Sequence, residues 1–272
     1  MQKFSRESQG DPKISIIVAV LNGVATLQRC IDSIAVQTYP YKELIIMDGG
    51  STDGTITILK KNQEIITYWE SSLDRGIYHA FNKAILLANG DYVCFLGADD
   101  YWADSASIDK LAQAAIINQF PDFVSGKVSI VNKYGAVVKI MGESWHSVKM
   151  KKCMVVAHPG MLHQQNVFRS FGVFSEKYKI ASDYEFLLRC NGKTTSVFID
   201  NLLVFMDDGG TSNKNIATVF CENFKIQSAR NDIGLARACM NYCIVWLKFI
   251  AKRILILFGH MPNCKAETNE RY

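Results

Sequence analysis

The feature that most constrains this chain is the alternation of apolar runs and amphipathic segments over residues 14–120. Ile14–Val20 is rich in β-branched residues and apolar apart from Ser15, which is typical of a strand covered on both faces of a parallel sheet. Leu27, Ile31 and Ile34 then recur at helical spacing. The same patterns predict strands at 14–20, 43–47, 65–69 and 91–96, two short helices before residue 62, and longer helices at 76–87 and 105–120. This alternation predicts an α/β fold with a mostly parallel central sheet flanked by helices.

The second half of the chain has a different pattern and is expected to form an attached α+β half. Strands are expected at 123–131, 136–141 and 197–205, with a helix near 183–190 and a helical tail. We therefore divide the chain into a flexible leader (1–12), one main domain (13–212) and a C-terminal helical extension (213–272). The main domain has two halves, 13–120 and 121–212.

Composition excludes several classes of function. The 272 residues are 49% hydrophobic and 21% charged, which suits a globular domain with a sizeable core. A net charge of +4 is too small to indicate a nucleic acid partner. The eight cysteines include no C-x-x-C pair, so we expect reduced thiols rather than a zinc site or disulfides. The polar N-terminus has no secretory pattern, and the sequence predicts a cytoplasmic protein.

Carboxylates follow two of the predicted strands. Asp48 ends the second strand, and Asp99 and Asp100 end the fourth. In open parallel sheets ligands bind at the carboxyl ends of the strands, so these acids are expected at one ligand-binding edge. Taken alone, Asp48 and Asp53 are better explained by ordinary turn chemistry. Capping explains Asp99 and Asp100 less well, because Asp104 already offers a cap for the next helix.

The turn after the second strand lacks the glycine-rich phosphate loops that hold nucleotides at a helix start. GGSTDG fits neither G-x-x-x-x-G-K-[ST] nor G-x-G-x-x-G. Carboxylates can approach a diphosphate only through a bridging cation, and their hard oxygens suit Mg²⁺ or Mn²⁺.

Five segments in order carry a resemblance to glycosyltransferase family 2. They read ISIIVAVLNG, ELIIMDGGSTDGT, SSLDRGIYHAFNKAI, GDYVCFLGADDYW and ASDYEFLLR. Each motif is weak alone, but five in the right order are specific. The resemblance covers residues 13–212 and is strongest to bacterial enzymes of surface polysaccharide synthesis, such as colanic acid and O-antigen transferases.

The resemblance implies a GT-A fold and an inverting, metal-dependent transferase. Its donor would be a nucleotide-diphosphate sugar, with UDP expected and GDP left open, and its acceptor a hydroxyl of a glycan or lipid-linked molecule. Residues 13–120 would bind the nucleotide and residues 121–212 the acceptor. The cofactor would be Mg²⁺ or Mn²⁺.

The resemblance also assigns donor-side residues. The nucleotide-sugar site would comprise Ala19, Leu21, Asn22, Asp48, Asp74, Arg75, Ala98 and Asp99. Asp99 would also hold the metal ion, because Gly97 stands where many members have the first Asp of the D-x-D element. A second departure is Gly49, at a position where the family often has another acid.

The family's general base corresponds to Asp183, with Ser182 in place of the usual preceding Glu. The residues themselves also fit a capping box, with Ser182 at N-cap and Glu185 at N3. An acid in the first helical turn is favoured by the helix dipole, so a purely structural role for Asp183 stays open at this point. On the acceptor side, the resemblance indicates His158, although a lone His is more often structural.

The C-terminal extension contains a strongly apolar segment, residues 241–259, that is interrupted by Lys248, Lys252 and Arg253. It has no uncharged span of 18 residues, so a transmembrane helix is not expected. Either it packs on the protein with a solvated basic edge, or it lies on anionic lipid. We favour association with a membrane surface, on the inner face of the cell membrane, or an oligomer contact, because so much apolar circumference needs cover.

Two further functions compete with sugar transfer. A nucleotidyltransferase that makes the nucleotide sugar should have basic residues after the first strand, and residues 21–27 (LNGVATL) have none. A sugar- or lipid-binding module that has lost catalysis is supported by the departures at Gly97 and Ser182.

Overall fold

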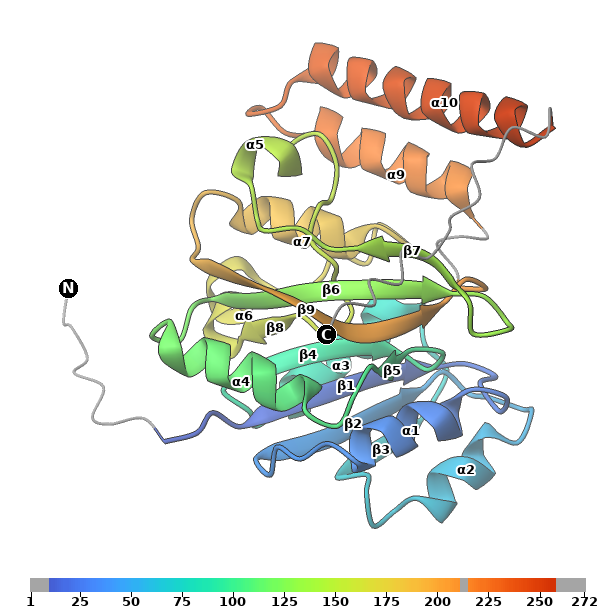
Figure 1. Ribbon diagram of the computed structural model, residues 1–272, viewed down its shortest axis with the longest axis vertical. Coiled ribbons are helices and arrows are strands. Elements are labelled where there is room, and N and C mark those ends of the chain that lie inside the picture. Colours follow the sequence, from blue (N-terminus) through green and yellow to red (C-terminus); the bar gives the residue numbers. More distant parts are fainter. Residues whose placement is uncertain (1–9, 211–214, 258–272) are drawn as a thin grey trace, which may run out of the picture.

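Four parallel strands form one half of a nine-stranded sheet in the computed structural model, which describes residues 10–210 and 215–257 (Figure 1). They are β1 (Ile14–Val20), β2 (Lys42–Asp48), β3 (Tyr68–Ser71) and β4 (Tyr92–Gly97), in the order β3-β2-β1-β4. The chain passes between them through the helices α1 (Leu27–Ala35), α2 (Thr55–Lys61) and α3 (Ile77–Leu87).

Helices cover both faces of these strands, which explains why β1 is almost entirely apolar. Ile16 and Val18 belong to a core cluster with α1, α2 and α4 (Ser107–Ile117). Ile17 points the other way, into a second cluster with α3 and α7 (Ser182–Cys190). Because successive side chains alternate across a strand, a strand buried on both faces is apolar on both. The exception, Ser15, is buried and donates its hydroxyl to Glu43.

The second half of the sheet is mixed. It continues from β4 through β8 (Leu162–Gln164), β6 (Phe123–Val131) and β9 (Ser196–Asp207) to β5 (Tyr101–Trp102), and β7 (Val137–Met141) pairs with β6. β6 and β9 are parallel, whereas β8 pairs antiparallel with both β4 and β6. Two short helices, α5 (Ser147–Met150) and α6 (Gln165–Phe171), complete this half. The predicted α/β class with a GT-A arrangement is confirmed.

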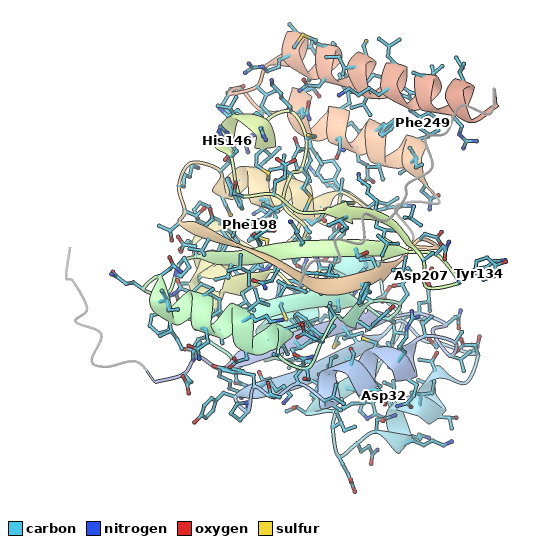
Figure 2. All side chains as sticks on the ribbon, in the orientation of Figure 1. Asp32, Tyr134, His146, Phe198, Asp207 and Phe249 are labelled. Carbon is cyan, nitrogen blue, oxygen red and sulfur yellow. The ribbon has the colours of Figure 1, made fainter. Side chains whose placement is uncertain are left out.

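The C-terminal extension forms two helices, α9 (Ile216–Ser228) and α10 (Leu235–Leu257). α9 packs against α7 and buries Ile226 in the second core cluster. α10 lies on α9 through ring contacts such as Phe220 with Phe249, and it is the outermost element at that end of the molecule (Figure 1; Figure 2 labels Phe249). The division of the chain at residue 212 stays a prediction, and residues 1–9, 211–214 and 258–272 lie outside the described part.

Two local expectations were wrong. The strand expected at 65–69 lies later, because Ile65 and Ile66 donate their backbone N–H groups to Asn62 and close the end of α2. α4 is shorter than 105–120; Asp104 accepts the N–H of Ala106 in a turn before the helix.

Candidate functional site

The strand register brings the predicted donor residues to one edge. Val20 at the end of β1 pairs with Asp48 on β2, and Ala19 pairs with Gly97 on β4. The chain turns away from the sheet directly after these positions. The polar residues that follow the three strands therefore meet at the carboxyl edge of the parallel half, as the sequence predicts.

Asp48 orders the turn that follows β2. It is 3% exposed, and its carboxylate accepts hydrogen bonds from the backbone N–H groups of Gly50 (3.0 Å) and Ser51 (2.9 Å). It also accepts hydrogen bonds from the hydroxyls of Ser51 (2.5 Å) and Ser71 (2.6 Å). Most of its acceptor capacity is used inside the protein, so Asp48 shapes this edge by holding the turn.

The loop after β1 is fixed to the same turn. Asn22 has a positive φ of 52°, donates its N–H to the Ser51 hydroxyl (2.6 Å) and accepts the Thr52 N–H (2.9 Å). Leu21 beside it is 61% exposed at the rim. The other two residues assigned to the donor from strand ends, Ala19 and Ala98, are half-buried.

The turn after β4 folds its two carboxylates toward Gly97. Asp100 is 5% exposed and accepts the Gly97 N–H (2.8 Å). A Cβ at Gly97 would lie 2.6 Å from Asp99 Oδ1 and 3.1 Å from Asp100 Oδ2. The space that an acid at residue 97 would need is thus filled by the two carboxylates that follow it.

The carboxylates of Asp99 and Asp100 repel each other in this turn. Burial, together with the nearby Asp99 carboxylate, raises the pKa of Asp100 to about 8. A divalent cation beside Asp99 would relieve this repulsion, and carboxylate oxygens suit Mg²⁺ or Mn²⁺. In the described ranges, no group of three or more His, Cys, Asp or Glu side chains could hold a metal ion. The residues fit a cation whose other ligands come from substrate and water.

Arg29 is the basic residue beneath this turn. From α1 it donates to the Asp99 backbone carbonyl (2.9 Å), lies 3.8 Å from the Asp207 carboxylate, and stacks on Tyr101 (4.3 Å). Figure 2 shows Asp207 at the end of β9, and the Gly210 that follows it would bring a Cβ within 3.7 Å of Asp99 Oδ2. The end of β9 therefore also reaches the candidate site.

The segment before α3 links this edge to the second half. Asp74 accepts the Gly76 N–H (2.8 Å), and its Oδ2 lies 2.7 Å from where a Cβ on Gly49 would be. The Asp74 carboxylate therefore occupies the place of a side chain at residue 49. Arg75, assigned to the donor, is exposed and donates through Nε (2.9 Å) and an Nη (2.7 Å) to Glu176.

Asp183 lies at the start of α7, partly buried. Its Oδ1 accepts the N–H of Tyr184 (2.7 Å) and lies 3.2 Å from the Tyr78 hydroxyl, which also donates to the Ile180 carbonyl (2.6 Å). Burial raises the pKa of Asp183 to about 6, although the hydrogen bonds act in the opposite direction. A carboxylate with a pKa just below neutrality is ionised at pH 7 and still a competent base.

The expected capping box at α7 was wrong. Ser182 is the first residue of the helix and its hydroxyl donates to the Ser175 carbonyl (2.7 Å), while Glu185 pairs with Arg189 (2.9 Å). The backbone N–H groups of 179–181 are instead satisfied by Glu222 from α9.

His158 lies in an aromatic cluster. It is 7% exposed and stacked on Phe95, with 5.4 Å between ring centroids. Burial lowers the pKa of its imidazole to about 4, so the ring is neutral at pH 7. Its Nε2 has no hydrogen-bond partner among the described residues. Its contact with an acceptor stays a prediction.

Residues 15–175 match the family model described as glycosyl transferase family 2. The chain belongs to glycosyl transferase family 2. As a member of this family the protein is a glycosyltransferase, which decides against the nucleotidyltransferase alternative.

Curated relatives of this glycosyltransferase are themselves named as glycosyltransferases. It is 29% identical over 188 residues to a PGL/p-HBAD biosynthesis glycosyltransferase of Mycobacterium bovis. The aligned region covers 66% of this chain and 70% of that protein. It is 28% identical over 223 residues to a poly(ribitol-phosphate) beta-glucosyltransferase of Bacillus spizizenii, spanning 78% of this chain and 35% of that one.

Two solved structures share the fold of the glycosyltransferase. S. aureus TarS 1-349 in complex with UDP-GlcNAc superposes with a TM-score of 0.66 at 17% identity, covering 85% of this chain and 70% of TarS 1-349. The mannosyltransferase PcManGT from Pyrobaculum calidifontis, in complex with GDP-Man and Mn²⁺, superposes with a TM-score of 0.57 at 17% identity. The match covers 92% of this chain and 80% of PcManGT.

Sequence reasoning missed three residues of the glycosyltransferase site. Tyr78 lies in a quoted motif, but its contact with Asp183 spans 105 positions. Arg29 lies on the polar side of α1, and no local pattern indicates its contact with Asp99, 70 residues away. Glu222 lies in the C-terminal extension, about 40 positions after the loop that it holds, and no local pattern indicates this contact. For Tyr78 alone a signal existed, because its position on α3 falls on the buried face.

Proposed function

We propose that the protein is an inverting glycosyltransferase that moves a sugar from a nucleotide-diphosphate sugar to an acceptor hydroxyl, with Asp183 as the base. One observation carries the proposal: a continuous set of contacts joins the ligand edge of the sheet to Asp183. Gly49 faces Asp74, Asp74 fixes Gly76 at the start of α3, and Tyr78 two residues later contacts Asp183.

In the proposed reaction the acceptor hydroxyl attacks the anomeric carbon from the face opposite the nucleotide. The new bond joins the acceptor oxygen to that carbon, the bond from the carbon to the diphosphate oxygen breaks, and the acceptor proton passes to Asp183. General base catalysis of this kind typically contributes about 10²–10⁴-fold. The Tyr78 hydroxyl and the Tyr184 N–H hold the carboxylate in one orientation.

The leaving group is a nucleoside diphosphate, and it is proposed to lie over the turn at Asp99. Mg²⁺ or Mn²⁺ held by Asp99 would neutralise the charge that develops on the diphosphate. Arg29 fixes this turn through the Asp99 carbonyl. The donor pocket would be completed by Ala19, Leu21, Asn22 and Ala98, with Asp48 holding the turn beside them and Asp74 and Arg75 at the start of α3.

The relatives support a UDP-sugar donor and an acceptor in surface polysaccharide or glycolipid synthesis. TarS 1-349, with the higher TM-score of the two solved structures, was solved with UDP-GlcNAc, and PcManGT with GDP-Man. The relative from B. spizizenii acts, by its name, on poly(ribitol-phosphate). We therefore place a glycan or lipid-linked acceptor in the half formed by residues 121–212, beside His158.

A panel of UDP- and GDP-sugars tests the proposed function. We expect release of the nucleoside diphosphate from one UDP-sugar, faster with Mn²⁺ than with a chelator, and calorimetric binding of UDP that tightens with Mn²⁺. Inverted configuration in the product, read by NMR, checks the stereochemistry. Binding of UDP without metal dependence and without turnover of any donor would favour a module that has lost catalysis.

The outer face of α10 supports a membrane location for this reaction. One side of the helix packs on α9, and the rest of its surface carries exposed apolar residues, namely Leu235, Met240, Ile244, Leu247, Ile250 and Ile254. Lys248 and Arg253 are also exposed on this helix, and α10 contains no acidic residue. In the described part of the chain, no helix is long and apolar enough to cross a membrane. An apolar face with only positive charges suits an anionic lipid surface, and we propose that α10 lies on one.

Vesicle sedimentation tests this membrane location. The protein is expected to bind vesicles containing phosphatidylglycerol and not phosphatidylcholine alone, and Leu247→Asp should weaken binding about tenfold or more by removing apolar contact and adding repulsion. Leu86→Asp is the matched control, because Leu86 is an 82% exposed leucine on α3. Vesicle binding unaffected by Leu247→Asp, or a lipid-independent dimer that this variant abolishes, would contradict the proposal.

A further inference from the structure

Three consecutive backbone N–H groups before α7 converge on one side chain of α9. Glu222 Oε1 accepts the N–H of Lys179 (2.8 Å), and Oε2 accepts those of Ile180 (3.0 Å) and Ala181 (2.9 Å). Glu222 is 7% exposed. Asp183 follows this loop by two residues, so Glu222 fixes the backbone from which the proposed base projects.

The loop has no capping side chain of its own for these N–H groups. The residue before the helix is Ala181, which has no capping side chain, and the Ser182 hydroxyl is turned to the Ser175 carbonyl. The N–H groups at a helix start need acceptors, and a buried carboxylate needs donors. The Glu222 carboxylate supplies the acceptors, and the N–H groups supply the donors. Charge-assisted hydrogen bonds of this kind are about twice as strong as neutral ones.

α9 is itself held against α7 by a second set of buried contacts. Gln227, 3% exposed, donates to the Tyr184 hydroxyl (3.0 Å) and the Lys152 carbonyl (3.0 Å). From α10, Asn241 donates to Gln227 (2.8 Å) and to the Lys151 carbonyl (3.3 Å). These contacts fix the distance between α9 and α7, and therefore the position of Glu222.

We propose that Glu222 is a positioning residue for Asp183, and that the C-terminal helix α9 is thereby part of the catalytic apparatus. This inference rests on the proposed function, in which Asp183 is the base. The charged and titratable groups that face Asp183 are Tyr78 from α3 and Glu222 from α9, since Glu185 on its own helix is paired with Arg189. The negative charge of Glu222 adds to the burial that raises the pKa of Asp183.

Two variants separate the geometric effect of Glu222 from that of its charge. Glu222→Gln removes the charge and turns an amide N–H toward a backbone donor. We expect kcat to fall about 10- to 100-fold, because a base displaced by about 1 Å loses rate on that scale, while KM for the donor stays within about twofold. The acidic limb of the kcat–pH profile, expected near pH 6 in the unaltered enzyme, should move to lower pH. Glu222→Asp keeps the charge but shortens the reach, so kcat should fall without that movement.

Gln227→Ala is the control for the charge, because it loosens α9, and with it the position of Glu222, without removing a carboxylate. It is expected to lower thermal stability while leaving the acidic limb in place. If Glu222→Gln fails to fold, Glu222→Asp decides, and unchanged kcat in that variant overturns the inference. If Asp183→Asn is inactive but the Glu222 variants keep kcat within about twofold of the unaltered enzyme, the inference about Glu222 is overturned and the base assignment stands. Full activity of Asp183→Asn overturns the base assignment and the inference with it.

Discussion

Asp183→Asn is expected to lower kcat for sugar transfer by about 10²–10⁴-fold, the range that a positioned general base contributes. The amide cannot accept the acceptor proton, yet its oxygen can still accept the Tyr184 N–H that holds the carboxylate now. The nucleotide should bind as before, because the strand ends that form the donor edge are unchanged. Single-turnover transfer and calorimetric UDP binding, measured on the same preparation, check both halves of this expectation.

The matched control is Glu185→Gln, which removes the same charge two residues further along α7, where Glu185 pairs with Arg189. Its transfer rate should stay within about twofold of the unaltered enzyme. Transfer by Asp183→Asn at the control's rate would remove Asp183 from the role of base.

The same substitution, Asp183→Asn, is expected to preserve or raise the stability of the fold while it lowers activity. The pKa of Asp183 is raised from 3.8 to about 6 in the folded protein, so the ionised form destabilises the fold. This contribution is absent at low pH, grows as pH rises through 3.8, and reaches about 3 kcal/mol once pH exceeds 6. Asp183→Asn should therefore melt no lower than the unaltered protein at pH 8, which distinguishes a lost base from a damaged fold.

The parallel half of the fold could be predicted because each of its elements depends on a local pattern. Ile14–Val20 is apolar at every position except Ser15, whose buried hydroxyl donates to Glu43, and such a run is typical of a strand between two helical layers. The placement of Asp48 and Asp99 at one edge then follows from the parallel direction of the strands, without any contact being known. The strand expected at 65–69 failed because two apolar residues were used to close a helix instead.

The support of the base could not be predicted, because it is not local. Ser182 and Glu185 have the spacing of a capping box, yet the loop is held by Glu222, about 40 positions further along the chain. A carboxylate that satisfies three N–H groups at once is a better partner than a single hydroxyl, so tertiary structure overrides the local pattern. Arg29 is a similar case, since its contact with Asp99 is recognisable only once α1 is packed on the sheet, and for Tyr78 the sequence indicates burial but not the contact with Asp183.

The surroundings of Gly97, in the turn that is expected to hold the cation, likewise could not be predicted from the local sequence. By sequence it is the missing half of a two-carboxylate element. In the structure, Asp99 Oδ1 and Asp100 Oδ2 occupy the space where a side chain at residue 97 would begin. Asp100 is buried and bound to the Gly97 N–H, so its carboxylate shapes the turn from inside. Asp99, half-exposed at the same edge, is the carboxylate that a diphosphate and its cation can reach.

Asp99→Asn should therefore remove most of the response to divalent cations. We expect Mn²⁺ to tighten UDP binding at least tenfold in the unaltered enzyme and to have little effect in the variant, because an amide oxygen carries no charge for the cation. Transfer at saturating donor should fall about 10²-fold or more, since charge on the departing diphosphate is then less well neutralised. Titration of UDP with and without Mn²⁺ and rates over a range of Mn²⁺ concentrations measure both effects.

Asp104→Asn is the charge-matched control on the same side of the sheet, because Asp104 is an exposed carboxylate five residues further on that pairs with Lys110 (2.6 Å). It should keep the full Mn²⁺ response. An Asp99→Asn variant whose rate rises with Mn²⁺ as steeply as that of the control would mean that the cation is held elsewhere. Because Gly210 approaches Asp99 and Asp207 ends β9 three residues before it, the end of β9 would then be the next region to test.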